Sequence, residues 1–306
     1  MSSLISVNHL SRHYGDFCAV NDISFELAVG DILGFLGPNG AGKSSTMQML
    51  SGNLAPTLGE ISINGIDLLE QPKQAKASLG YLPETPPLYK EMTVTEYLDF
   101  CGRLHRINRQ QRHNICDSAI EHCGLGHVQH RLIQNLSKGY QQRVGIAQAI
   151  LHSPPVIILD EPTVGLDPIQ ILEIRALIKT LGENHGIILC THILPEVQAV
   201  CNRVQIIDKG SLVYSADMDD MLNRQATCYE IVLSPTIKQV DISGDDIFKS
   251  VTTMSDNRFL IESDLPAEEI IEHTVRQKWG LTHFSSHHTS LEQIFIDLTL
   301  TDDKAS

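Results

Sequence analysis

The fold of this chain is decided by the stretch Gly37-Pro38-Asn39-Gly40-Ala41-Gly42-Lys43-Ser44, which fits the pattern G-x-x-x-x-G-K-[ST] in full. The apolar run Ile32 to Leu36 precedes it, and a helix is predicted from Lys43 to Ser51. In such a loop the glycines adopt backbone conformations that other residues avoid, so that successive N–H groups and the start of the helix surround a phosphate. The sequence therefore predicts a nucleotide-binding loop between a strand and a helix.

Two side chains of this loop have distinct predicted roles. Lys43 is expected to reach the β- and γ-phosphates, and the Ser44 hydroxyl is expected to ligate Mg²⁺. The full set of residues predicted to hold the nucleotide in this loop is Gly37, Pro38, Asn39, Gly40, Ala41, Gly42, Lys43, Ser44 and Ser45. A phosphate-binding loop alone does not indicate what the nucleotide is used for.

The composition of the chain excludes several classes of protein. Of the 306 residues, 42% are hydrophobic and 20% are charged, which is typical of a globular protein. No apolar run approaches the about 18 residues of a membrane-spanning helix, and the N-terminus lacks the pattern of a signal peptide. We therefore expect the chain to stay in the cytoplasm.

Charge, cysteine and histidine content bear on partners and metals. The net charge of -14 opposes sequence-independent binding to nucleic acid, so no nucleic-acid partner is expected. The seven cysteines are scattered and form no C-x-x-C pair, which is typical of reduced thiols and predicts neither a disulfide nor a zinc site. His283, His287 and His288 lie close together, but short polar loops collect such residues, and we predict no metal site there.

The first 222 residues alternate patterns typical of strands and helices, which predicts an α/β domain. Val156 to Leu159 and Ile187 to Cys190 are nearly continuous apolar runs, which are typical of central parallel strands. Between these strands a helix is predicted from five apolar residues at helical spacing, namely Ile171, Ile174, Leu177, Ile178 and Leu181. Asp208-Lys209-Gly210 is predicted to form the turn of a hairpin.

Residues 223–306 lack such motifs and are predicted to form a small α+β accessory domain. Short strands are expected at Tyr229 to Leu233 and Arg258 to Ile261. Helices are expected from about Pro266 to Trp279 and around Leu291 to Leu298. The role of this second domain is left open by its sequence.

Two carboxylates follow the strand Val156 to Leu159. Asp160 is placed to hold Mg²⁺ through its water shell. Glu161 stands beside it, where a carboxylate can polarise a water molecule aimed at the γ-phosphate. This pair favours nucleotide hydrolysis over phosphoryl transfer to a second substrate.

Further motifs occur along the chain. In sequence order they are Tyr14, Leu136-Ser137-Lys138-Gly139-Tyr140-Gln141-Gln142-Arg143, Gly165-Leu166-Asp167 and His192. Together with the phosphate-binding loop, they resemble the motifs of the ATP-binding subunits of ABC transporters, over roughly residues 4–214. The resemblance implies a P-loop NTPase of the ABC-ATPase fold with a helical subdomain at about residues 86–150. It also implies ATP and Mg²⁺ as cofactors, and it makes Asp167 the D-loop aspartate.

The resemblance assigns roles to four of these residues. Ser137 and Gly139 open a predicted helix whose start can bind an anion, and in the family this anion is the γ-phosphate of ATP held by the opposite subunit. His192 is implied to bind the γ-phosphate and orient the attacking water, beside the catalytic Glu161. Tyr14 is implied to stack on adenine, and the alternative is a tyrosine that packs without a ligand.

Two departures from the family pattern point to a subgroup. Lys138 and Tyr140 replace a glycine and a glutamine of the usual L-S-G-G-Q, and Glu84 stands where the family has the Q-loop glutamine. A carboxylate oxygen still ligates Mg²⁺, so Glu84 is predicted as a metal ligand. Both variants resemble ATPases of ABC-2 type exporters, in which a C-terminal extension such as that ending at Phe295 is common.

The segment from Pro86 to about Arg131 corresponds to the family's helical subdomain, whose groove receives a short helix of the membrane partner. Apolar residues recur at helical spacing at Val94, Tyr97, Leu98, Cys101 and Leu104, and basic residues follow at Arg103, Arg106, Arg109 and Arg112. The alternative is a solvated basic helix face without a partner.

The resemblance implies an ATP hydrolase that drives transport through a separate integral membrane permease and pairs with a second ATP-binding subunit. Its expected location is the cytoplasmic face of the inner membrane. Export is favoured, and an importer subunit is the alternative. A soluble ABC-type ATPase acting on ribosomes or DNA, and a nucleotide sensor with little turnover, are the other two classes considered; the acidic charge opposes the first and Glu161 opposes the second.

Overall fold

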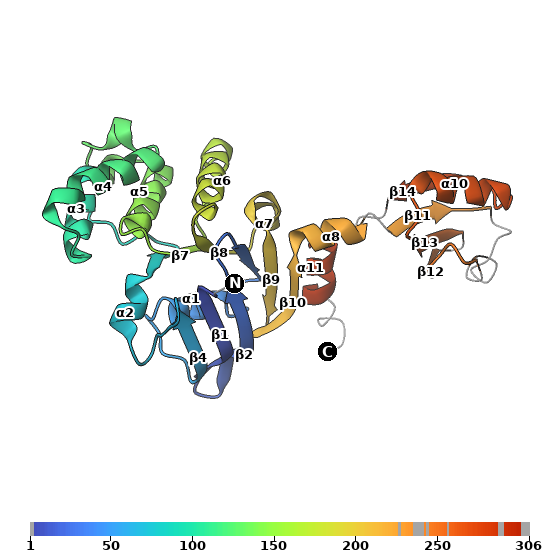
Figure 1. Ribbon diagram of the computed structural model, residues 1–306, viewed down its shortest axis with the longest axis horizontal. Helices are drawn as coiled ribbons and strands as arrows, with labels where there is room; N and C mark the ends of the chain where they lie inside the picture. The colour runs from blue at the N-terminus through green and yellow to red at the C-terminus, as the bar shows by residue number, and fades with distance from the viewer. Residues whose placement is uncertain are drawn as a thin grey trace. The chain divides into compact units, whose positions relative to one another are not determined.

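Figure 1 shows the computed structural model, which describes residues 3–225, 228–234, 242, 245–255, 257–286 and 291–300. His287 and His288 lie outside these residues. The chain divides into two compact units, Met1–Ala216 and Asp217–Ser306. We propose that these units are the two domains expected from the sequence, and each is described by itself.

The first unit contains a six-stranded sheet in the order β10-β9-β3-β8-β7-β6. Its strands are β3 (Ile32–Leu36), β6 (Leu79–Leu82), β7 (Val156–Asp160), β8 (Gly186–Thr191), β9 (Arg203–Asp208) and β10 (Ser211–Asp217). A four-stranded antiparallel sheet in the order β2-β1-β4-β5 accompanies it. Its strands are β1 (Ile5–Tyr14), β2 (Phe17–Leu27), β4 (Leu58–Ile63) and β5 (Ile66–Asp67).

The helices of this unit include the ones predicted around the phosphate-binding loop and after Asp167. They are α1 (Lys43–Leu50), α2 (Pro72–Ala77), α3 (Val94–Leu104), α4 (Arg109–His122), α5 (Lys138–Ile150), α6 (Pro168–Gly182) and α7 (Leu194–Val200). Two short 3-10 helices, Gly126–Val128 and Ile133–Asn135, precede α5. In Figure 1 the helices α3, α4 and α5 gather in one group, drawn in green.

The central strands β3, β7 and β8 are buried along their whole length. Strand β8 pairs in parallel with both β3 and β7, and the registers place Leu36 opposite Thr191 and Asp160 opposite Cys190. Parallel strands that are buried on both faces consist of continuous apolar residues, as the sequence predicted. The residues that follow these three strands therefore leave the sheet at one common edge.

Helix α3 packs its predicted apolar stripe into the helical group. It begins with a capping box, in which Thr93 and Glu96 exchange hydrogen bonds with each other's backbone N–H groups. Four residues of the stripe are buried, whereas Leu104, at the last position of the helix, is 66% exposed. Two of the predicted basic residues, Arg103 and Arg112, form ion pairs with Asp99 at 2.6 and 2.5 Å.

The second unit contains a four-stranded antiparallel sheet in the order β12-β13-β11-β14. Its elements are α8 (Met218–Gln225), β11 (Cys228–Val232), β12 (Ser250–Ser255), β13 (Arg258–Glu262), α10 (Ala267–Arg276), β14 (His283–Ser286) and α11 (Leu291–Leu300). A separate apolar core includes Tyr229, Ile231, Phe259, Ile270 and Trp279. Among the described residues, no helix combines the length and the apolar character needed to cross a membrane.

The two cores predict separate unfolding of the two units. Phe35 is fully buried and packs against Phe25, so Phe35→Ala should destabilise the Met1–Ala216 unit by about 3–5 kcal/mol. The single tryptophan, Trp279, is buried in the other core, so the transition that its fluorescence reports should not move. Circular dichroism and tryptophan fluorescence during urea unfolding would separate the two transitions.

Leu58→Ala is the matched control, because Leu58 is 63% exposed and its truncation should cost about 0.5 kcal/mol or less. A shift of the Trp279 transition in Phe35→Ala would contradict independent folding of the units.

Candidate nucleotide-binding site

A cavity of about 420 Å³ lies at the common edge of β3, β7 and β8. It is lined by Tyr14, Phe17, Ala19, Asn39, Gly40, Gly42, Lys43, Ser44, Ser45, Glu84, Glu161, Val164 and His192. The structure thus brings together the phosphate-binding loop, Tyr14, which is predicted to stack on adenine, the carboxylate of Glu84, and the two predicted catalytic residues. These residues come from five separate stretches of the sequence.

The phosphate-binding loop is shaped by backbone that only glycine adopts easily. Gly42 is the N-cap of α1 and has φ 108°. A Cβ atom at this position would lie 2.5 Å from the carbonyl oxygen of Ala19. Within the loop, the N–H of Ala41 donates to the carbonyl of Pro38 at 3.3 Å. The tight turn places the start of α1 at the cavity, where the N–H groups of the helix can face an anion.

Lys43 is 6% exposed and folds back over its own loop. Its Nζ donates to the carbonyl oxygens of Gly37 at 2.8 Å and Pro38 at 3.1 Å. An ammonium group has three N–H donors, so one remains that can be directed at a phosphate oxygen. This arrangement fixes the lysine beside the position predicted for the phosphates.

The aromatic wall of the cavity consists of Tyr14 and Phe17. The Tyr14 side chain is 44% exposed, and the guanidinium of Arg12 lies 4.6 Å from the centre of its ring. Phe17 is 62% exposed and was missed by the sequence analysis, although it is only three residues from Tyr14. Exposed rings that border a cavity can stack on a planar base.

Asp160 ends β7 and is 6% exposed. Burial is the main cause that raises the pKa of this carboxyl; a hydrogen bond with Cys190 and the charge of Lys43 act in the opposite direction. Ser44 and Glu84 line the cavity beside the loop. Hydroxyl and carboxylate oxygens are the hard ligands that Mg²⁺ prefers, so this donor set fits the ion.

Among the described residues, no cluster of three or more His, Cys, Asp and Glu side chains is arranged to hold a metal ion. Mg²⁺ usually binds through one or two carboxylates together with substrate phosphates and water. The sparse donor set of this cavity is of that kind, and Ser44, Glu84 and Asp160 remain predicted ligands.

Glu161 is held at both carboxylate oxygens. Its side chain is 11% exposed, Oε1 lies 2.8 Å from His192 Nδ1, and Oε2 lies 3.3 Å from the Thr191 hydroxyl. Its backbone has φ 49°, in the left-handed region, and its N–H donates to the carbonyl of Cys190 at 2.8 Å. A non-glycine residue in this conformation needs support from its surroundings, and the end of β8 supplies it.

Ser137, Gly139 and Asp167 gather elsewhere, at the starts of α5 and α6. The Ser137 hydroxyl accepts from Tyr140 N at 3.4 Å, and Asp167 accepts from Gln170 N at 3.0 Å. A Cβ atom at Gly139 would lie 2.4 Å from Oε1 of Gln170, so α5 and α6 begin side by side. These three predicted residues do not line the 420 Å³ cavity of their own chain.

Lys138 and Tyr140, the two residues that depart from the usual L-S-G-G-Q pattern, make contacts within the chain. Lys138 Nζ would lie 2.6 Å from a Cβ atom at Gly165, so its ammonium covers the D-loop glycine. The Tyr140 hydroxyl lies 2.9 Å from His127 Nε2. Each variant side chain thus has a structural partner beside the start of α5.

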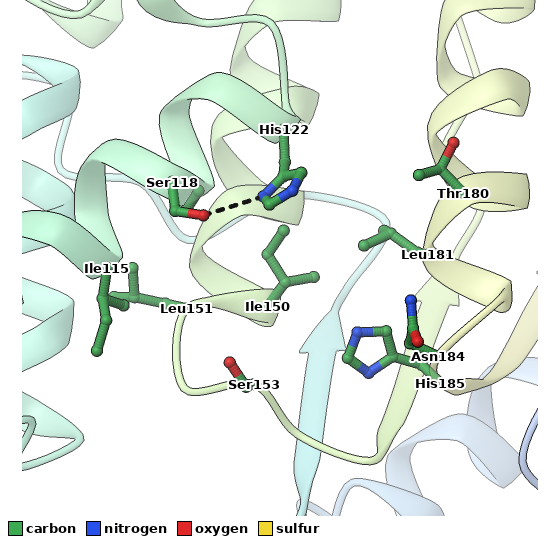
Figure 2. A pocket seen from close by; sticks show the side chains of 11 residues that line it. Ile115, Ser118, His122, Ile150, Leu151, Ser153, Thr180, Leu181, Asn184 and His185 are labelled. Atoms are coloured by element: carbon green, nitrogen blue, oxygen red, sulfur yellow. Dashed lines mark hydrogen bonds between the residues drawn. The ribbon is translucent and has the colours of Figure 1, made fainter.

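A second cavity, of about 240 Å³, lies between α4, the end of α5 and the end of α6 (Figure 2). His122 and Ser118 of α4 are joined there by a hydrogen bond of 3.3 Å, and the side chains of Asn184 and His185 lie on the opposite side. Most of the predicted site residues line the first cavity. Gly37, Pro38 and Ala41 belong to the phosphate-binding loop without lining the cavity, and Asp160 ends β7 without lining it. Ser137, Gly139 and Asp167 lie at the starts of α5 and α6.

Comparison with known proteins identifies the family. Residues 20–164 match the ABC transporter family. The chain is 38% identical to the bacitracin transport ATP-binding protein BcrA of Bacillus licheniformis over 242 residues, which is 78% of each protein. This chain belongs to the ATP-binding subunits of ABC transporters. As an ABC ATPase subunit it binds ATP and is an ATP hydrolase.

Two further matches support the assignment of this chain to the family. The chain is 30% identical to the Nod factor export ATP-binding protein I of Rhizobium meliloti (strain 1021), over 80% of this chain and 77% of the relative. A solved structure described as the ATP binding subunit of an ABC transporter superimposes with a TM-score of 0.66 at 31% identity, covering 72% of this chain and 92% of that chain. The predicted family and the predicted ABC-ATPase fold are therefore confirmed.

The geometry of the loop predicts that Gly42→Ala weakens ATP binding by about tenfold or more, because the added methyl group would collide with the Ala19 carbonyl and displace the start of α1. Titration of the ATPase subunit with a fluorescent ATP analogue would measure the effect.

Gly65→Ala is the matched control. Gly65 also has positive φ, at 75°, but a Cβ atom there would meet nothing within 4 Å, so ATP affinity should stay unchanged. Equal affinities of Gly42→Ala and the unaltered protein would contradict this account of the loop.

Proposed function

We propose that this subunit hydrolyses ATP as a dimer and thereby powers export through a separate membrane permease. The observation that supports it most is the cavity that joins Lys43 of the phosphate-binding loop to the Glu161 and His192 pair. Export is supported by the names of two relatives, a bacitracin transport protein and a Nod factor export protein. The cargo itself is determined elsewhere, in the permease.

In the proposed mechanism the chain's own residues position and deprotonate water. The Nδ1–H of His192 donates to Glu161, so Nε2 of the neutral ring is an acceptor for a proton of the attacking water, and a doubly protonated ring would also donate to the γ-phosphate. Glu161 accepts a proton from the attacking water, and Lys43 neutralises charge on the phosphates. When Mg²⁺ is bound, Ser44, Asp160 and Glu84 would hold it, and the ion would neutralise further charge on the phosphates.

Dimerisation accounts for the residues that lie outside the cavity. Ser137 caps α5, so the start of this 13-residue helix presents N–H groups and a hydroxyl to an anion. In the proposed dimer these groups and Asp167 act on the ATP held by the other subunit. ATP then joins the two subunits, and hydrolysis releases them.

The proposed docking site for the permease is a groove of about 610 Å³ beside β6. It is lined by Gln48, Ser51, Asn53, Lys76, Leu79, Gly80, Tyr81, Pro83, Pro87, His105, Gln148 and His152. Pro83 directly precedes Glu84 in the chain, so an occupant of the groove lies next to a predicted Mg²⁺ ligand. A short helix of the permease would fill this groove and place the subunit at the cytoplasmic face of the membrane.

Glu161→Gln should reduce the rate of ATP hydrolysis by about a hundredfold or more, because an amide cannot accept the proton of the attacking water. ATP binding should persist, so the variant should accumulate as an ATP-dependent dimer. Measurements of phosphate release and analytical ultracentrifugation with Mg-ATP would test both effects.

Glu121→Gln, at an exposed position of α4, is the matched control and should behave as the unaltered protein. Turnover at the unaltered rate in Glu161→Gln would remove Glu161 as the base.

The permease partner is tested by a pull-down of tagged Glu161→Gln protein from detergent-solubilised native membranes with Mg-ATP. We expect a polytopic membrane protein to co-purify, and its sequence would distinguish an export permease from an import permease. Recovery of ribosomal or DNA-bound material without a membrane protein would contradict the proposed transport function.

A further inference from the structure

A second buried carboxylate, Glu196, lies behind the catalytic pair. It belongs to the first turn of α7 and is 1% exposed. It lies outside every motif recognised in the sequence and does not line the nucleotide cavity. A carboxyl group buried to this extent needs hydrogen-bond partners for both of its oxygens.

Two threonine hydroxyls meet Glu196. The Thr163 hydroxyl donates to Oε1, and the Thr191 hydroxyl oxygen lies 3.1 Å from Oε2. Thr163 follows Glu161 by two residues, and Thr191 directly precedes His192. Glu196 therefore links the turn after β7 to the end of β8, which are the two segments that carry the proposed catalytic residues.

The hydroxyl of Thr191 stands between two carboxylates. Its oxygen is 3.1 Å from Glu196 Oε2 and 3.3 Å from Glu161 Oε2, and it also accepts the N–H of Ile193 at 3.1 Å. A hydroxyl has one proton and two lone pairs. If both carboxyl groups were ionised, the hydroxyl proton of Thr191 could be donated to only one of them. The Thr191 oxygen would then face the oxygen of the other carboxylate with no hydrogen between them.

A single proton on either carboxyl group satisfies all of these contacts, and only a proton on Glu196 leaves Glu161 ionised, as its proposed role as the base requires. With a proton on Oε2, Glu196 donates to the Thr191 oxygen, whose second lone pair receives the Ile193 N–H. The hydroxyl proton of Thr191 is then directed at Oε2 of Glu161, while His192 donates to Oε1. Every donor and acceptor of Thr191 is used, and both oxygens of Glu161 receive a donor.

We propose that Glu196 is a positioning residue which, as a neutral acid, directs the Thr191 hydroxyl at Glu161 and thereby fixes the carboxylate that faces the attacking water. This inference rests on the proposed role of Glu161 as the base. Glu196 acts only through Thr191 and touches no substrate.

The electrostatic surroundings of Glu196 agree with a neutral acid. Burial is the largest cause that raises the pKa of Glu196, and the charge of Glu161 raises it further. The hydrogen bonds from Thr163 and Thr191 and the charge of Arg175 act in the opposite direction, and the net pKa is raised. Within the described residues no ion pair between Glu196 and a basic side chain is present, since the nearest partners are the two threonines.

The test compares substitutions that keep or remove the donor to Thr191. Glu196→Gln retains an acceptor for Thr163 and a donor for Thr191, so its kcat should stay within about twofold of the unaltered enzyme. Glu196→Leu should lower kcat by about tenfold with little change in KM for ATP, since the loss falls on the orientation of the base. Thr191→Val should reproduce this loss, and Thr191→Ser should restore kcat.

Thr180→Val is the matched control, because among the described residues the Thr180 hydroxyl donates a hydrogen bond only to the backbone of its own helix, at Ala176. Circular dichroism and ATP affinity would establish that each variant is folded. Should Glu196→Leu fail to fold, the Thr191→Val and Thr191→Ser pair decides alone. Unaltered kcat in Glu196→Leu, or in Thr191→Val, would overturn the positioning role.

The protonation state has its own readout. The infrared difference between the unaltered enzyme and Glu196→Gln at neutral pH should contain the C=O stretch of a protonated carboxylic acid, and a carboxylate band in its place would overturn the neutral state. Glu161→Gln is assayed in parallel. If that variant still hydrolyses ATP, the proposed base is wrong, whereas the infrared band still reports on Glu196.

Discussion

The site depends on the register of three parallel strands. Strand β8 lies between β3 and β7, with Thr191 opposite Leu36 and Cys190 opposite Asp160. Because the strands run in parallel, the phosphate-binding loop, the carboxylate Glu161 and the imidazole His192 leave the sheet at the same edge, although they are far apart in the sequence. A slip of one residue in either pairing would turn these side chains to opposite faces of the sheet.

The end of β8 holds the proposed base more firmly than a single contact would. Two consecutive residues, Thr191 and His192, contact the two oxygens of Glu161, and the carbonyl of Cys190 accepts its N–H. These contacts support the left-handed backbone of Glu161, which is costly for a residue with a side chain. The buried Glu196 extends the same arrangement away from the cavity.

The sequence predicted β3, α1, β7, α6 and β8 because each is marked by a continuous apolar run, a helical period or a glycine pattern, whereas β1, β2 and β6 were not predicted. It could not predict Phe17 as part of the cavity wall, since an exposed aromatic residue gives no periodic signal. Glu196 was missed because its importance comes from two threonines brought together by the sheet. Ser137 and Gly139 were recognised as a motif, yet within a single chain they do not line the nucleotide cavity.

The central claim is that ATP is enclosed between the phosphate-binding loop of one subunit and the start of α5 of another. A cryo-electron microscopy structure of Glu161→Gln protein with Mg-ATP tests it most directly. The account predicts a γ-phosphate within hydrogen-bond distance of Lys43 in one copy and of Ser137 and Gly139 in a second copy. A γ-phosphate bound by a single chain, with the start of α5 in the second copy facing solvent, would contradict the account.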